Sequence, residues 1–237
     1  MKTTPSGYRP RSKIYLLPVF LAVAALALSG WQFGKAAREQ EESDAQSRMK
    51  PADDDAPDMD ALRAENPDIV GWITIAALGI DYPITQTTDN SYYLTHTAQR
   101  VPNKMGSLFL DFRSGSGFTD FNSVVFGHYL KSGRMFGNLH RMRERATFGK
   151  VTEGALFTPE GTFRLEIFAS VLASSTSEFY QYIFPSRESR RAHLEAIRGQ
   201  AAFYRDIGIA PEDRLLTLST CSYEYEGART LVIARIA

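Results

Sequence analysis

The chain has 237 residues and carries 27 basic and 27 acidic side chains, so its formal net charge is zero. This length suits one compact domain with appendages better than two full domains. Balanced charge without a basic patch argues against nucleic acid as a partner, and a single cysteine excludes an internal disulfide.

The N-terminus is first basic and then apolar. Residues 1–13 contain four bases and no acid, and residues 14–34 contain no charged side chain. About 20 apolar residues suffice for a helix to span a bilayer, and bases before the span predict that the N-terminus stays inside. We therefore expect a cytoplasmic segment at 1–13, a single transmembrane anchor at 14–34 and an extracellular C-terminal part. The alternative is a cleaved signal peptide that ends near Ala25-Leu26-Ala27; either way the domain is exported.

The next segment reverses the sign of the charge. Residues 35–60 hold nine acids against four bases, which predicts a solvated acidic linker over residues 35–57. Asp58 can then cap a short helix over residues 58–66 that Pro67 stops. We place the folded domain at residues 58–237.

The folded domain is predicted to consist mainly of strands. Segments rich in β-branched and aromatic residues, separated by Gly, Pro, Asn and Asp, favour an antiparallel all-β barrel or sandwich. The expected strands are Val70–Ile75, Ile80–Ile84, Ser107–Leu110, Val124–Phe126, Thr162–Leu172, Leu215–Thr220 and Thr230–Ile236. One helix interrupts them: Ser186 can cap it, apolar residues recur at helical spacing, and we expect it to end near Asp206.

Cys221 ends a predicted strand in which side chains alternate between two faces. Leu216 and Leu218 then point to one face, whereas Thr217, Ser219 and Cys221 point to the other. The thiol therefore leaves the apolar face and joins small hydroxyl residues, which is a poor place for an inert packing cysteine.

Arg229 begins the following strand, after a loop over residues 223–227. A hairpin of this size returns Arg229 to about 5 Å from Cys221 if the register is direct. A permanent cation beside a thiol favours the thiolate and can also hold a developing oxyanion.

The chain offers four histidines as a third member of such a site. His193 lies in the predicted helix among charged residues and is expected at the surface, and His140 lacks strand context and is expected to be structural. His96 could border a groove. His128 follows a buried strand at the point where it meets a loop, a common place for catalytic groups. The residues favour His128 but leave His96 open.

These motifs together resemble those of the sortase family. Thr217–Cys221 with a downstream Arg229 is similar to the sortase signature, and Phe126-Gly127-His128 followed by Met135–Leu139 resembles its histidine segment. The similarity runs from about Met59 to the C-terminus. Within the family it looks like class B, because residues 186–206 match the long helix of that class. The resemblance implies a closed barrel of about eight strands, with N-terminal helices and this helix before the last strands.

The resemblance also implies a reaction. Cys221 would attack the threonine carbonyl of a C-terminal sorting signal on a surface protein, giving a thioester. His128 would protonate the leaving amine and later deprotonate the incoming one, and Arg229 would bind the oxyanion. The acceptor amine would come from a peptidoglycan precursor or a pilin lysine of a Gram-positive cell. No cofactor is implied, and the His, Asp and Glu residues show no spacing of metal ligands.

The same resemblance assigns Asn90, Leu94, Ser219 and Thr220 to the peptide site, although each could instead be an ordinary turn or core residue. Ser175 could reach the groove too, as could its neighbour Thr176, but no motif fixes either. Two other functions remain open. One is an exported, non-catalytic β-domain that binds peptide or heme, and the other is a hydrolytic cysteine protease, which would share the thioester.

Overall fold

The structure is a computed structural model that describes residues 16–47, 49 and 56–237. It falls into two units, one that ends at Glu42 and one that begins at Ser43. Helix α1 (Leu16–Ser47) runs well into the expected linker at 35–57, whose Ala, Glu, Gln and Arg residues are good helix formers. The expected cytoplasmic segment at 1–13 and the linker residues 48 and 50–55 lie outside the described residues.

Within the described part of the chain, no helix combines the length and the apolar character that crossing a membrane would require, so the structure does not support the transmembrane helix expected over residues 14–34.

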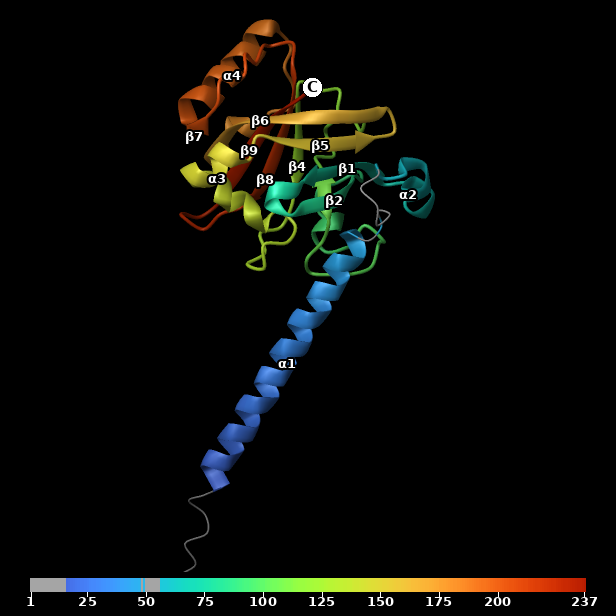
Figure 1. Ribbon diagram of the computed structural model, residues 1–237, viewed down its shortest axis with the longest axis vertical. Coiled ribbons are helices and arrows are strands. Elements are labelled where there is room, and N and C mark those ends of the chain that lie inside the picture. The colour runs from blue at the N-terminus through green and yellow to red at the C-terminus, as the bar shows by residue number, and fades with distance from the viewer. Residues whose placement is uncertain (1–15, 48, 50–55) are drawn as a thin grey trace, which may run out of the picture. The chain divides into compact units, whose positions relative to one another are not determined.

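Eight strands of the second unit close into a barrel, as the resemblance implied (Figure 1). Their order is β5-β1-β2-β3-β4-β8-β9-β6, the pairing of β5 with β6 completes the ring, and β7 extends the sheet beyond β6. The strands are β1 (Ile69–Ile75), β2 (Ile80–Thr85), β3 (Leu108–Leu110), β4 (Asn122–Phe126), β5 (Glu153–Thr158), β6 (Gly161–Ser174), β7 (Ala201–Tyr204), β8 (Arg214–Cys221) and β9 (Ala228–Ile236).

The expectation of a wholly antiparallel sheet was wrong for two pairs. β2 with β3 and β4 with β8 run parallel. A parallel pair needs a long crossover, and the chain supplies one each time, because residues 86–107 separate the first pair and residues 127–213 the second. The second crossover also contains the histidine segment and the inserted helix.

Short helices and turns precede β1 or connect the strands. They are α2 (Met59–Glu65), α3 (Arg145–Lys150) and α4 (Arg187–Gln200), with the 3-10 turns η1 (Ala76–Leu78), η2 (Tyr92–Leu94), η3 (Gly137–Arg143) and η4 (Glu178–Tyr180). The cap expected for α2 is confirmed, since the Asp58 carboxylate accepts the Ala61 N–H at 3.0 Å.

Helix α4 begins as expected, because the Ser186 hydroxyl accepts the Ser189 N–H at 3.2 Å. It ends at Gln200 rather than near Asp206. Residues 201–204, which were expected to continue the helix, form β7 instead, where Tyr204 pairs with Ala169 and Phe203 with Ser170 on the long strand β6. Ladder hydrogen bonds at an otherwise open edge thus outweigh the weak helical pattern of these residues.

The two larger of the domain's three apolar clusters lie on opposite faces of the barrel wall, while a small third one joins α2 to β1. One fills the barrel with side chains from all its strands, including Leu216 and Leu218 of β8. The other lies outside the barrel, where Leu194 and Ile197 of α4 pack on β6, β8 and β9; Figure 1 shows α4 beside β6 and β7. The two faces of β8 therefore differ as the alternation predicted, and Ser219 and Cys221 lie on the outer face.

His193 corrects the expectation of a surface residue. It is only 4% exposed, and its ring lies within 5.9 Å, 5.9 Å and 5.0 Å of the ring centroids of Phe121, Phe179 and Phe184. The nearby charged residues Arg191 and Glu195 are exposed, whereas His193 belongs with Leu194 to the buried side of α4. Burial lowers the pKa of the imidazole to about 4.

Candidate active site

A cavity of about 330 Å³ opens where β4 and β8 end. It is lined by all seven residues that the sequence singled out, namely Cys221, His128, Arg229, Asn90, Leu94, Ser219 and Thr220. The fold therefore gathers into one space residues that lie more than 130 positions apart in the chain. Their chemical roles remain predictions.

Cys221 and Arg229 lie opposite each other in the antiparallel pairing of β8 with β9, in the register that the hairpin predicted. Both side chains are half-buried. Arg229 Nη1 donates to the Ala228 carbonyl at 2.9 Å, and no ion pair of Arg229 occurs among the described residues. Its positive charge is thus not neutralised by a fixed carboxylate and can act on groups in the cavity.

His128 leaves β4 two residues after its last residue, Phe126. Its Nε2 lies 2.8 Å from the Leu94 carbonyl, which can only accept, so the neutral ring carries its proton on Nε2 and leaves Nδ1 as a base. Gly127 lets the backbone before His128 pass close to Leu108 and Phe136, since a Cβ there would lie 2.6 Å from Phe136 Cδ2.

The other candidate histidines lie elsewhere. His96 stacks on Tyr92 with a ring separation of 4.1 Å and binds the Tyr92 carbonyl through Nδ1 at 2.9 Å, and it does not line the cavity. His140 does not line it either, but its Nε2 lies 2.8 Å from the backbone carbonyl of Cys221. The structure thus favours His128 over His96 by position.

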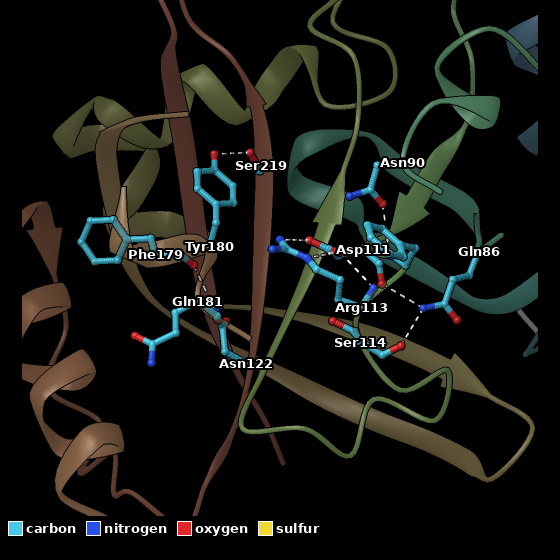
Figure 2. A network of polar contacts seen from close by, with 11 residues as sticks. Gln86, Asn90, Asp111, Arg113, Ser114, Asn122, Phe179, Tyr180, Gln181 and Ser219 are labelled. Atoms are coloured by element: carbon cyan, nitrogen blue, oxygen red, sulfur yellow. Dashed lines mark hydrogen bonds and ion pairs between the residues drawn. The ribbon is translucent and has the colours of Figure 1, made fainter. Parts of the chain in front are cut away.

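Asn90 reaches the cavity but is partly committed to another contact. Its Oδ1 accepts the Phe112 N–H at 3.0 Å, between Asp111 and Arg113 (Figure 2). Arg113 also lines the cavity, and its Nε and Nη2 donate to Asp111 at 2.9 Å and 2.6 Å. Burial alone would raise the pKa of the Asp111 carboxyl, but the hydrogen bonds from Arg113 outweigh it and hold that pKa below its usual value.

Tyr180 forms another wall, and its hydroxyl lies 2.8 Å from that of Ser219 (Figure 2). The adjoining backbone is fixed by Asn122, whose amide donates to the carbonyls of Phe179 at 3.1 Å and Gln181 at 3.2 Å. Burial raises the pKa of the Tyr180 phenol, which therefore stays neutral and can donate its hydrogen bond.

Sequence reasoning missed both Arg113 and Tyr180. The only local signal for Arg113 is an Asp-Phe-Arg run directly after a strand, and Tyr180 lies 39 residues from its partner Ser219. Each reaches the cavity only because the barrel brings separate connections together.

Two predicted substrate residues differ in exposure. Leu94 is 38% exposed at the rim, where it can meet a ligand. Thr220 is buried, and its Oγ1 has no hydrogen-bond partner among the described residues. Ser175 lines the cavity, and a wider neighbouring cavity of about 870 Å³ shares Ser175, Arg113 and Tyr180 with it and also contacts Thr176.

The cavity thus combines a thiol, an imidazole and a guanidinium that has no fixed counter-charge among the residues that the structure describes. These are the groups required for acyl transfer through a covalent thioester: a nucleophile, an oxyanion partner and a proton carrier.

Comparison with known proteins gives matches over most of the chain. Residues 73–237 match the Sortase domain family. Over 180 residues the chain is 33% identical to sortase B of Listeria monocytogenes, an alignment that covers 74% of this chain and 72% of that protein.

Solved structures give the same result. The X-ray structure of Clostridium perfringens sortase B superposes with a TM-score of 0.71 at 28% identity, covering 75% of this chain and 98% of the other. A Streptococcus pyogenes class B sortase involved in pilus biogenesis superposes with a TM-score of 0.68 at 29% identity, covering 76% and 98%.

Proposed function

Because the chain belongs to the sortase family, whose members are cysteine transpeptidases, we propose that it cleaves a C-terminal sorting signal and transfers the acyl fragment to an amine. Its relatives are class B sortases. The observation that carries the proposal is the direct pairing of Cys221 with Arg229 beside His128 in one cavity.

In the first half-reaction, the Cys221 thiolate attacks the threonine carbonyl of the sorting signal. The carbonyl π electrons move to oxygen, and the Arg229 guanidinium donates hydrogen bonds to that oxyanion. When the tetrahedral intermediate collapses, the C–N bond breaks and protonated His128 supplies the proton that the leaving amine requires. The products are a thioester on Cys221 and the released tail.

In the second half-reaction, an incoming amine attacks the thioester. Neutral His128 takes a proton from that amine, the oxyanion forms again beside Arg229, and the C–S bond breaks. The thiolate returns and a new amide bond remains. Water can replace the amine at this step, and the chain would then act as a protease.

We propose two classes of acceptor, a peptidoglycan cross-bridge amine and a pilin lysine. The second is supported by the similarity to the streptococcal class B sortase involved in pilus biogenesis. The extracellular site of action expected from the N-terminal charges stays a prediction, which protease treatment of intact cells would test.

The deciding experiment mixes the full-length protein with a sorting peptide and either a cross-bridge peptide or a lysine-containing pilin peptide. Mass spectrometry should detect an acyl-enzyme on Cys221 and a ligated product with at least one amine. Cys221→Ala is the matched control and should give neither. Cleavage to the free acid alone, at every amine concentration, would establish a protease instead, and binding without cleavage would establish a non-catalytic domain.

A further inference from the structure

The backbone carbonyl of Cys221 has no neighbouring strand, among those that the structure describes, from which it could accept a hydrogen bond, because of where β4 ends. The Ser222 N–H donates to the Ala228 carbonyl at 2.9 Å, so the alternating antiparallel pattern turns the polar groups of Cys221 away from β9. On the side of β8 that faces β4, the pairing ends with Phe126 opposite Ser219. The Ser219 carbonyl accepts the Gly127 N–H at 3.1 Å. Cys221 is two residues beyond Ser219, past the end of β4.

His140 takes the place of the missing strand. Its Nε2 lies 2.8 Å from the Cys221 carbonyl, across 81 residues of sequence. Because a carbonyl oxygen only accepts, Nε2 must carry the proton. The peptide group that follows the nucleophile is thus fixed at both ends, with its C=O bound by His140 and its N–H by Ala228.

The turn that carries His140 is itself firmly held. Leu139 and Met142 of η3 are fully buried in the barrel cluster that contains Leu216 and Leu218 of β8. The Asn138 amide donates to the Leu78 carbonyl at 2.9 Å. A donor on such a support can hold a strand end in place, whereas a donor on a mobile loop could not.

Further contacts between the same segments continue beyond Cys221. Arg143 of η3 forms an ion pair with Glu224, which also accepts a hydrogen bond from the Ser222 hydroxyl. The Tyr129 ring lies between His140 and Tyr223, at 4.5 Å and 5.4 Å from their rings. η3 and Tyr129 therefore contact the chain from Cys221 to Glu224 at several points.

We propose that His140 is a positioning residue for Cys221, which holds the end of β8 so that the thiol stays aligned with Arg229 and His128. The expected effect on kcat rests on the proposed transpeptidation, whereas the structural role of His140 does not. His140 does not line the cavity, and it contacts Cys221 through the backbone carbonyl, so we expect its effect to act through the backbone of Cys221.

The first test compares two substitutions at His140. His140→Leu keeps the bulk but loses the donor, and kcat should fall about ten-fold or more, since small misplacements of a reacting group are costly. KM for the sorting peptide should not change, because the peptide cavity is intact. His140→Gln should restore most of kcat, because its Nε2 amide donor reaches about as far from the backbone as the imidazole Nε2.

A matched control is His96→Leu, because His96 also binds a backbone carbonyl but lies away from the cavity. It should keep wild-type kcat. The proposal would be overturned if folded His140→Leu kept the wild-type kcat. It would also be overturned if kcat fell equally in His140→Gln and His140→Leu.

The second test does not depend on activity. In the wild-type protein, long-range ¹⁵N correlations should show the Nε2–H tautomer of His140, and an Nδ1–H tautomer would overturn the proposal. Hydrogen exchange in residues 219–226 should be faster in His140→Leu than in the wild type and unchanged in His96→Leu. If no sorting peptide were turned over, the proposed function would fail, but these measurements would still decide the role of His140.

Discussion

Arg229 can act on Cys221 in two ways, through its charge or through the planar fork of its donors. A charge role requires only a nearby cation, whereas an oxyanion role requires two N–H groups held in one plane. The Nη1 bond to the Ala228 carbonyl limits rotation of the guanidinium, which favours the fork.

Arg229→Lys separates these roles. Lysine keeps the charge but not the paired donors, so we expect kcat to fall on the order of 10²- to 10³-fold, while iodoacetamide still alkylates Cys221 readily. Steady-state kinetics and alkylation rates measure the two effects. Near-normal turnover of the lysine variant would leave only the electrostatic role.

His128 and His96 allow an internal comparison, because both bind a backbone carbonyl but only His128 lines the cavity. We expect His128→Ala to reduce kcat by about 10²- to 10⁴-fold, the usual contribution of general acid–base catalysis. His96→Ala should retain most activity. The reverse result in a peptide-ligation assay would move the proton carrier to His96.

Among single residues, the sequence predicted those whose positions follow from the geometry of one strand or one hairpin. Strand alternation and hairpin register were enough to bring Arg229 opposite Cys221. They could not identify His140, because its contact with Cys221 depends on where β4 ends and on how η3 packs against the barrel.

At the scale of elements, strands with strong apolar patterns were predicted and those with weak patterns were not. β8 and β9 were found from their β-branched and aliphatic residues. β5 was missed, although Pro159-Glu160 before Gly161 marks its turn into β6. β7 was taken for helix because its pairing with β6 is a tertiary effect that no local propensity reports.

The turn η4 shows how a connection outside the barrel shapes the cavity. It lies between β6 and α4, and the Tyr180 hydroxyl joins it to Ser219 on β8, while the Asn122 amide binds its backbone (Figure 2). Its position therefore depends on these hydrogen bonds together with the burial of Phe179 in the outer apolar cluster.

Tyr180→Phe removes one of these bonds without changing the packing of the ring. A typical hydrogen bond contributes about 0.5–1.5 kcal/mol, so we expect KM for the sorting peptide to rise roughly two- to ten-fold with little change in kcat. Tyr204→Phe, on β7 and away from the cavity, is the matched control and should change neither constant. An unchanged KM in Tyr180→Phe would show that the hydroxyl does not shape the peptide site.

For the molecule as a whole, stability depends largely on the two larger apolar clusters, and an ionisable group is buried in the outer one. His193 lies in it among three phenylalanine rings, and its Nε2 has no hydrogen-bond partner in the described part of the chain. A protonated imidazole there would be a buried charge without compensation, so the folded state requires the neutral form.

This burial makes the free energy of unfolding depend on pH. The pKa of His193 is about 4 in the folded protein against an ordinary 6.5, so between these values the unfolded chain binds the extra proton. The free energy of unfolding therefore has its full value above pH 6.5 and decreases as the pH falls toward 4, by up to about 3 kcal/mol.

Between pH 7 and pH 5 we expect urea denaturation to show that His193 lowers the free energy of unfolding by about 2 kcal/mol. His193→Leu keeps an apolar side chain in the cage and should lose less stability over the same interval, by about that amount. Equal pH dependence in the two proteins would show that His193 is not held neutral by the fold.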